Sequence, residues 1–372
     1  MAQPTREHAP AGADPAPPRP TRPVTWFAVT GAAVLVVQAY AWARWALSGQ
    51  MVPAPPGPTP IPGWMELLAR ITEVLNFAGG LAVLGWFVVR PWVKDRKLSF
   101  DGMLVIIWVQ MWLLQDPIQN WTVNNFAYNV TFVNLGSWTS SLPGWVAPNS
   151  HLMGEPLLWG LGAYAVGMFL PMLACCALMR KVRERRPTIG TAGLIGVAVV
   201  AMSVFLIILE TFWVRTGQYS YMGVVKSLSL WPDTYYQYPM YSWLAWSVFW
   251  GLMVALRFFR NDRGQTVAER GIENLRLTPR RTQAVRFLAL VGLCNLMYAF
   301  LYCLPMNLFA THVDSFPQDV LDRSYLTSGL CGLGTDRACS DPRYPTPREG
   351  SGYVTPDGRL VLPAAPTERS GS

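Results

Sequence analysis

The apolar residues of this chain fall in blocks of roughly 20, each bounded by charged or turn-forming residues. A helix of about 20 residues crosses a hydrocarbon core about 30 Å thick, so such blocks are typical of membrane-spanning helices. Charged residues make up only 14% of the 372 residues, whereas an average soluble domain carries about 25%. We therefore expect an all-α fold, a polytopic helical bundle in the cell membrane, rather than a soluble enzyme.

Seven blocks qualify as spans, at about 24–47, 66–90, 100–120, 154–179, 190–214, 239–259 and 285–309. The third is the least regular, because Asp116 precedes Pro117 and a residue before proline disfavours the α conformation. We expect the bundle to cover 23–310. The flanking segments, 1–22 and 311–372, contain stretches rich in Pro, Gly, Ser and charge and are expected to be largely disordered tails.

Basic residues alternate between the two sides of the expected bundle. Lys and Arg number three in 1–23, four in 90–99, five in 180–189 and eight in 257–286, whereas 48–65 and 117–153 have none and 215–238 has two. Because loops rich in Lys and Arg stay in the cytoplasm, this pattern predicts a cytoplasmic N-terminus and, with seven spans, a C-terminus outside. The same clustering argues against nucleic-acid binding, in spite of the net charge of +8.

The six cysteines show no metal-binding spacing. Four lie within expected spans, where cysteine commonly packs as a small apolar side chain: Cys175, Cys176, Cys294 and Cys303. Cys331 and Cys339 lie on the expected outer side, where a disulfide between them and two free thiols are both open.

Acidic side chains in or beside the spans gather toward the outer end of the expected bundle. They are Glu66, Glu73, Asp116, Glu155, Glu210 and Asp233. Ionisable groups in a bilayer are costly and commonly mark function. On the second span Glu66, Arg70, Glu73 and Asn76 recur every three or four residues and form one polar stripe. We therefore predict a polar pocket sunk into the outer half of the bundle and walled by aromatic residues.

Three of these acidic residues also have a specific structural explanation. Asp116 and Glu155 precede prolines and could cap helix starts, and Glu210 could form an interfacial ion pair with Arg215. Tryptophans near helix ends are commonly part of the interfacial aromatic belt.

Several classes of chemistry are excluded by missing motifs. With three histidines, the chain lacks the residues for His-box di-iron enzymes and for cytochromes with paired His ligands. It also lacks HExxH, GxSxG, glycine-rich phosphate loops and paired Asp-rich motifs for diphosphate and metal. These absences leave two alternatives. One is acid/base chemistry by carboxyl groups, with no cofactor and no metal, and the other is transport.

Three short strings resemble a known family: QDPIQNW at 115–121, HLMGEP at 151–156 and ETFW at 210–213. On these segments, over roughly 65–310, the chain resembles the avermectin spirocyclase (AveC-like) family of integral membrane proteins of actinobacteria. The resemblance implies a macrolide- or polyketide-tailoring enzyme that closes a dihydroxy-ketone into a spiroketal, sometimes with a following dehydration. It carries over no residue roles.

The site residues are therefore our own hypothesis, based on shared depth in the membrane. The predicted acid/base set is Glu73, Asp116, Glu155 and Glu210. The predicted substrate-binding residues are Asn76, Gln119, Asn120, His151, Trp112, Trp121, Trp159 and Trp213. A carboxyl group in a low-dielectric pocket can stay protonated while another is ionised, and aromatic faces can stabilise a cationic intermediate. The expected partner is a lipophilic, polyketide-like small molecule in the bilayer.

Three other functions compete with this interpretation of the residues. A proton or small-molecule transporter also uses carboxylates within the membrane, although no inverted repeat is evident. Another cofactor-independent cyclase, acting on a terpenoid or another lipid, would use the same acids and tryptophans. A membrane scaffold without activity has little need for six acids at one level.

Overall fold

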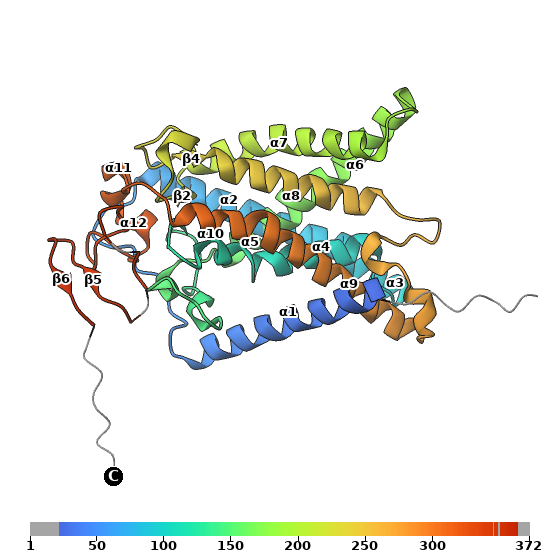
Figure 1. Ribbon diagram of the computed structural model, residues 1–372, viewed down its shortest axis with the longest axis horizontal. Helices are drawn as coiled ribbons and strands as arrows, with labels where there is room; N and C mark the ends of the chain where they lie inside the picture. Colours follow the sequence, from blue (N-terminus) through green and yellow to red (C-terminus); the bar gives the residue numbers. More distant parts are fainter. Residues whose placement is uncertain (1–21, 345, 349, 364–372) are drawn as a thin grey trace, which may run out of the picture.

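The computed structural model describes residues 22–344, 346–348 and 350–363. Long helices lie side by side, and a cap of loops, short helices and short strands covers one end of the bundle (Figure 1). The expected mostly helical class is confirmed. Except for its last residue, the N-terminal tail expected at 1–22 lies outside the described residues.

Five helices in the described part of the chain are long and apolar enough to cross a membrane. They correspond to the first, second, fourth, fifth and seventh expected spans. Their parts are α1 (Arg22–Leu47); α2 (Gly63–Leu84) with η1 (Gly85–Val89) and α3 (Arg90–Asp95); α5 (Leu157–Gly162) with η5 (Ala163–Met168) and α6 (Phe169–Arg185); α7 (Thr191–Arg215); and α9 (Pro279–Tyr298) with η9 (Ala299–Cys303) and α10 (Leu304–Ala310). The elements η1, η5 and η9 are π-helical turns. Such turns are rare in proteins, and those that occur are often found at functional sites.

Two further helices, α4 (Phe100–Trp112) and α8 (Met240–Phe258), complete the bundle. The third span, expected over 100–120, is wrong in its second half, because α4 ends at Trp112 and the 3₁₀ helix η2 (Asp116–Asn120) follows. The Asp116-Pro117 pair explains the break. With 13 mostly buried residues, α4 is enclosed by its neighbours. The count of seven spans and the inside/outside orientation remain predictions.

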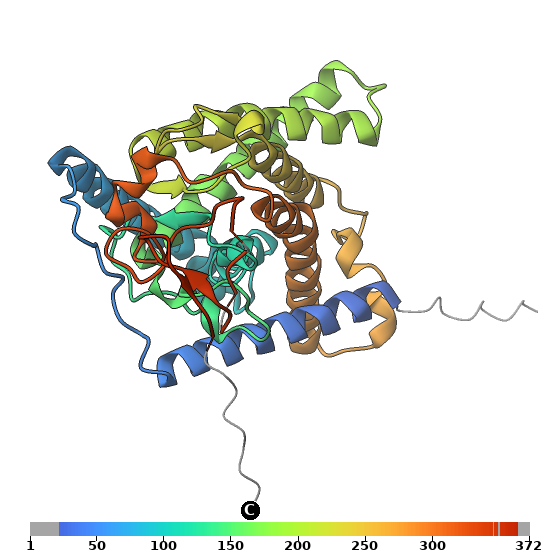
Figure 2. The same cartoon turned by 60° about the vertical axis from the view of Figure 1, so that its left-hand side comes forward.

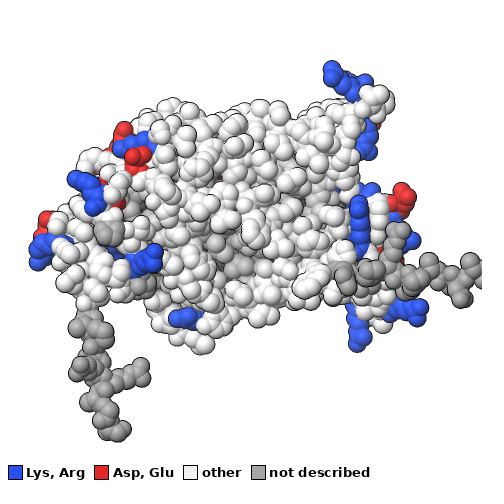
Figure 3. Space-filling model, viewed as in Figure 1, with Lys and Arg blue, Asp and Glu red and all other residues white. Residues whose placement is uncertain are grey.

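Charged side chains gather at the two ends of the bundle and leave the face between them nearly uncharged (Figure 3). Such a band is the surface that a hydrocarbon core would cover. One end carries the basic connections around α3 and before α9 (Figure 3).

The helix α1 lies across α9 at a close approach between two glycines (Figure 2). A Cβ atom on Gly31 would lie 2.0 Å from the carbonyl oxygen of Leu288, and one on Gly292 would lie 2.0 Å from that of Phe27. Small residues at such crossings let membrane helices pack backbone against backbone.

Short strands and helices form the cap. The strand β1 (Phe126–Tyr128) pairs antiparallel with β2 (Tyr219–Tyr221), so that Tyr128 lies opposite Tyr219 and Phe126 opposite Tyr221. The other strands are β3 (Ser229–Leu230) with β4 (Tyr238–Pro239), and β5 (Tyr353–Val354) with β6 (Leu360–Val361). The short helices are η3 (Thr139–Ser141), η4 (Ser150–Leu152), η6 (Lys226–Leu228), η7 (Val267–Glu269), η8 (Ile272–Leu275), α11 (Gln318–Leu321) and α12 (Ser324–Thr327).

Part of the C-terminal segment packs onto this cap, which differs from the disorder expected over 311–372. Val320 and Leu330 join Met153 and Met222 in a buried apolar cluster, because these side chains remove apolar surface from water. Cys331 and Cys339 are joined by a disulfide bond. Of the two alternatives for this pair, the structure therefore has the disulfide.

Candidate active site

A small buried cavity lies between the helices and the β1–β2 ribbon, at the capped end of the bundle. Its volume is about 30 Å³, which is room for one or two water molecules. It is lined by Asp116, Gln119, Phe126, Tyr128, Trp159, Ala163, Tyr164, Met168, Glu210, Trp213, Tyr219, Tyr221, Tyr238, Ser242, Trp246 and Tyr302. Two carboxyl groups, six phenols and three indoles thus face one enclosed space.

Asp116 accepts hydrogen bonds from three tyrosines. The hydroxyl of Tyr164 lies 2.6 Å from Oδ1, that of Tyr298 lies 3.3 Å from the same oxygen, and that of Tyr128 lies 2.8 Å from Oδ2. Asp116 is the first residue of η2, just after α4 ends at Trp112, so the break in the helix is where this carboxylate lies. Tyr164 comes from η5, Tyr298 from the end of α9 and Tyr128 from β1.

Glu210 reaches the same cavity from the last turns of α7. Its Oε2 accepts a hydrogen bond from the hydroxyl of Tyr219. The chain reverses between these two residues at Gly217, which has a φ of 66° that favours glycine. A Cβ atom at Gly217 would also lie 2.5 Å from the side chain of Met65. The turn therefore fixes where Tyr219 meets the carboxyl group.

A chain of hydroxyl groups runs along another wall of the cavity. The hydroxyl of Tyr221 lies 3.0 Å from that of Ser242, which lies 3.3 Å from that of Tyr302. Tyr302 in turn donates to Oε1 of Gln119 over 3.1 Å. These residues belong to β2, α8, η9 and η2, so the chain ties four elements together around the cavity.

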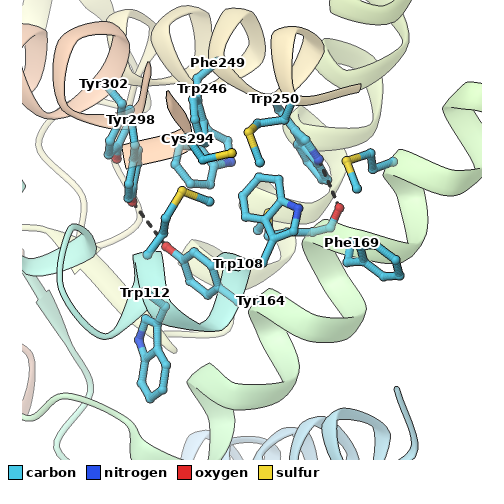
Figure 4. Packing of buried hydrophobic residues seen from close by; sticks show 14 of the residues in the cluster. Trp108, Trp112, Tyr164, Phe169, Trp246, Phe249, Trp250, Cys294, Tyr298 and Tyr302 are labelled. Atoms are coloured by element: carbon cyan, nitrogen blue, oxygen red, sulfur yellow. Dashed lines mark hydrogen bonds between the residues drawn. The ribbon is translucent and has the colours of Figure 1, made fainter. Parts of the chain in front are cut away.

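Aromatic rings close the cavity on the remaining sides. Trp159 and Trp213 pack edge to face with centroids 5.1 Å apart, and Nε1 of Trp159 donates to Gln218 over 2.8 Å. Figure 4 shows Tyr298, Tyr302 and Trp246 gathered near Tyr164, with the hydrogen bond between the hydroxyl groups of Tyr298 and Tyr164 drawn. Rings that face a dry space can stabilise a positive charge.

Of the four predicted catalytic acids, the structure brings Asp116 and Glu210 to the cavity. Glu155 is buried but does not line the cavity; it lies in the loop before α5, where Oε1 accepts a hydrogen bond from Ser137 over 3.3 Å. Its Oε2 has no hydrogen-bond partner among the described residues. Burial, and next the charge of Asp116, raise the pKa of Glu155 well above its usual value. We therefore expect a neutral carboxyl group at Glu155.

Glu73 does not line the cavity. Its Oε1 accepts the backbone N–H of Val133 over 2.7 Å, and its Oε2 lies 3.0 Å from Arg70. Through Oε1 this buried carboxylate holds the loop after β1 against α2, while Oε2 pairs within α2. Of the polar stripe expected on the second span, only Glu73 is shown in contact with that loop, whereas Glu66 and Arg70 are exposed.

We predict a structural effect at Glu73. Glu73→Leu leaves the N–H of Val133 without its acceptor, at a cost of about 1–3 kcal/mol, whereas Glu73→Gln keeps an acceptor oxygen and loses only the ion pair. Thermal unfolding in detergent should rank wild type above Glu73→Gln and Glu73→Leu last, with turnover per folded molecule unchanged in Glu73→Gln. A Glu73→Gln variant that folds normally but has lost turnover would place Glu73 in the reaction.

Three of the eight predicted substrate-binding residues line the cavity, namely Gln119, Trp159 and Trp213. Asn120 instead shapes the turn into β1: its Oδ1 accepts the N–H groups of Asn125 and Phe126, at 3.1 and 3.0 Å. By fixing β1 it acts on the cavity through Tyr128.

The other four predicted binding residues lie away from the cavity. Asn76 donates to the carbonyl of Thr72 within α2, and the rings of Trp121 and Trp145 pack 5.4 Å apart. Trp112 is buried beside Tyr164. The remaining residue is His151, whose carbonyl accepts the N–H of Ser137.

Sequence reasoning missed the tyrosines. The lining tyrosines are Tyr128, Tyr164, Tyr219, Tyr221, Tyr238 and Tyr302. A signal existed for some of them, because Tyr164, Tyr298 and Tyr302 are phenols within otherwise apolar spans and the last two are four residues apart on one helix face. No signal marked β1 and β2, which are three residues each. In the described ranges, no group of three or more His, Cys, Asp or Glu residues could hold a metal ion.

A family model described as "Spirocyclase AveC-like" matches residues 95–326, which is more than half of the chain. The chain belongs to the AveC-like spirocyclase family. This confirms the resemblance and suggests a cyclase of polyketide tailoring. The matched range contains every residue that lines the cavity, whereas α1 and α2 lie before it. No curated protein matches the chain, and neither does any solved structure.

Proposed function

We propose that this protein is an integral membrane cyclase that closes a lipophilic dihydroxy-ketone into a spiroketal by acid/base chemistry. One observation carries the proposal: Asp116 and Glu210 face the same buried, aromatic cavity. The family match supports the reaction class. The carboxyl groups and phenols of the cavity supply proton donors and acceptors, which are what this reaction requires.

The reaction has two bond-forming steps and releases one water. A hydroxyl adds to the ketone and gives a hemiketal. Proton donation to the hemiketal hydroxyl then expels it as water and leaves an oxocarbenium ion. The second hydroxyl attacks this ion, and its proton passes to a base. A buried acid and a buried base that line one cavity can serve both steps without bulk water.

The hydrogen bonds of the two carboxyl groups suggest which is the base and which is the acid. Asp116 receives three phenolic donors, and an ionised carboxylate is the form that only accepts hydrogen bonds. We therefore assign Asp116 as the base and as the negative charge beside the oxocarbenium ion. Glu210 accepts a hydrogen bond from Tyr219 and has fewer phenolic donors than Asp116, and we assign it as the proton donor. The rings of Trp159, Trp213 and Trp246 add cation–π stabilisation of about 2 kcal/mol when desolvated.

A cavity of about 30 Å³ has room for only a small part of such a substrate, so the rest of the substrate must lie elsewhere. A groove of about 590 Å³, lined wholly by apolar residues, opens between α6 and α7. Gly167 lines this groove, and its Cβ position lies 3.8 Å from the ring of Trp213, which lines the cavity. We propose that the substrate enters from the bilayer here and leaves its hydrocarbon part in the groove.

Filling the groove tests this route. Gly167→Leu places a branched side chain in the groove against Trp213, and we expect a raised KM with a smaller effect on kcat. Gly196→Leu is the matched control, since a Cβ atom there meets nothing within 4 Å and the residue is exposed on α7. Equal KM values for the two variants would exclude this entry route.

The path from the cavity toward the opposite end of the bundle is closed. Trp108, Phe249 and Trp250 are fully buried there, and Trp108 packs edge to face against both other rings at 5.7 and 6.4 Å. A transporter needs a polar path through this region. We therefore favour an enzyme.

The test is turnover without a gradient. Purified protein in lipid nanodiscs receives a synthetic apolar dihydroxy-ketone, and mass spectrometry follows a product that is lighter by one water. We expect product formation above that of empty nanodiscs, and no substrate-dependent proton flux in proteoliposomes. Proton flux without product would reassign the cavity to transport.

A further inference from the structure

A second pocket lies at the opposite end of the bundle from the cavity, the end predicted to face the cytoplasm. It has a volume of about 330 Å³ and is formed by the end of the composite helix α2–α3, the start of α4 and the residue Arg260 after α8. Three cationic side chains line it, those of Arg90, Lys94 and Arg260. Nothing in the proposed reaction uses this pocket.

The positive charge in the pocket is only partly neutralised by the protein. None of the three cations forms an ion pair within the described residues. Two carboxylates also line the pocket, but Asp101 is held by two hydrogen bonds of 2.9 Å from Arg257, which leaves Asp95 alone against three cations. Like charges held together repel unless an anion lies between them.

Two of the cations are held in place on aromatic rings. The guanidinium of Arg90 lies 4.2 Å from the ring centre of Trp86, and that of Arg260 lies 5.0 Å from the ring centre of Phe100. A stacked guanidinium keeps the N–H donors in its plane free for oxygen ligands. The two guanidinium groups therefore present free N–H donors from different elements of the pocket, and the ammonium group of Lys94 adds a further positive charge.

The pocket lies where lipid headgroups are expected. Trp86 and Trp92, which are 61% and 49% exposed, flank Arg90 at the end of the long helix, and exposed tryptophans at helix ends are typical of the membrane interface. We propose that this pocket binds the phosphate of an anionic phospholipid, with the guanidinium groups of Arg90 and Arg260 as its ligands. Basic pockets between membrane helices on the cytoplasmic side bind such headgroups.

Lipid retention tests the proposal on the full-length protein. Native mass spectrometry from mixed micelles of phosphatidylglycerol and phosphatidylcholine should show one phosphatidylglycerol retained selectively by wild type. We expect the affinity to fall about tenfold or more in Arg90→Gln/Arg260→Gln and to stay unchanged in Arg281→Gln, which removes an exposed cation at the same end. If the double variant does not fold, Lys94→Gln should show a smaller loss.

Thermal unfolding separates a lipid from a soluble anion. Phosphatidylglycerol should raise the melting temperature of wild type above the value in phosphatidylcholine, and millimolar inorganic phosphate should not. An equal shift from inorganic phosphate, equal retention of the two lipids, or equal retention by wild type and the double variant would each overturn the proposal. All of these readouts are independent of spiroketal formation.

Discussion

Glu210→Gln is expected to lower kcat by about 10²- to 10⁴-fold, the usual contribution of a general acid. The change preserves the size of the side chain and an acceptor for Tyr219, so the β1–β2 ribbon and the fold should persist. It removes the proton that expels water from the hemiketal. Single-turnover formation of the spiroketal in nanodiscs measures the effect, with the melting temperature as a check on folding.

Glu66→Gln is the matched control, because Glu66 is an exposed acid on α2 and does not line the cavity. We expect this variant to turn over at the wild-type rate. Equal rates for Glu210→Gln, Glu66→Gln and wild type would remove Glu210 from the mechanism.

Asp116→Asn is expected to reduce turnover by a similar factor and also to lower stability. An asparagine side chain turns an N–H₂ group toward phenols that now donate to the carboxylate, which leaves buried hydroxyl groups poorly paired at a cost of about 1–3 kcal/mol. It also removes the negative charge that we place beside the oxocarbenium ion. Kinetics in nanodiscs and thermal unfolding report the two effects separately.

Tyr164→Phe tests how much the positioning of the Asp116 carboxylate matters when its negative charge is kept. It removes only the hydroxyl that lies 2.6 Å from Oδ1 of Asp116, and we expect a loss of turnover smaller than that of Asp116→Asn. Tyr40→Phe, at an exposed position on α1, is the control for the loss of a phenol. If Asp116→Asn folds and keeps wild-type turnover, the base assignment is wrong.

The helical bundle could be predicted from the sequence because lipid imposes strong rules on it. Apolar blocks mark α1, α7 and the other long helices within a few residues. The third span failed because α4 is enclosed by other helices and need not cross the whole hydrocarbon core itself. The pair Asp116-Pro117 indicated a break, since it disfavours a continuous helix to residue 120.

Part of the candidate site could be predicted from the sequence, namely two of its acidic residues. Depth along each helix correctly grouped Asp116 with Glu210, but it could not separate them from Glu73, which lies at a similar level and faces the loop at Val133. Whether an acidic side chain faces the cavity or a loop depends on the rotation of its helix about the helix axis and on the path of the cap segments. The ribbon that carries Tyr128 and Tyr219 joins segments about 90 residues apart, and its three-residue strands leave no periodic pattern to detect.

The most direct test of the central claim is the diastereomer ratio and rate of spiroketal formation by wild type and by the Asp116→Asn/Glu210→Gln double variant. The account predicts one dominant diastereomer from wild type. For the folded double variant it predicts the uncatalysed rate and mixture, with a loss well below the product of the two single losses, because both groups serve one sequence of steps. A folded double variant that retains the wild-type rate and diastereomer ratio would contradict it.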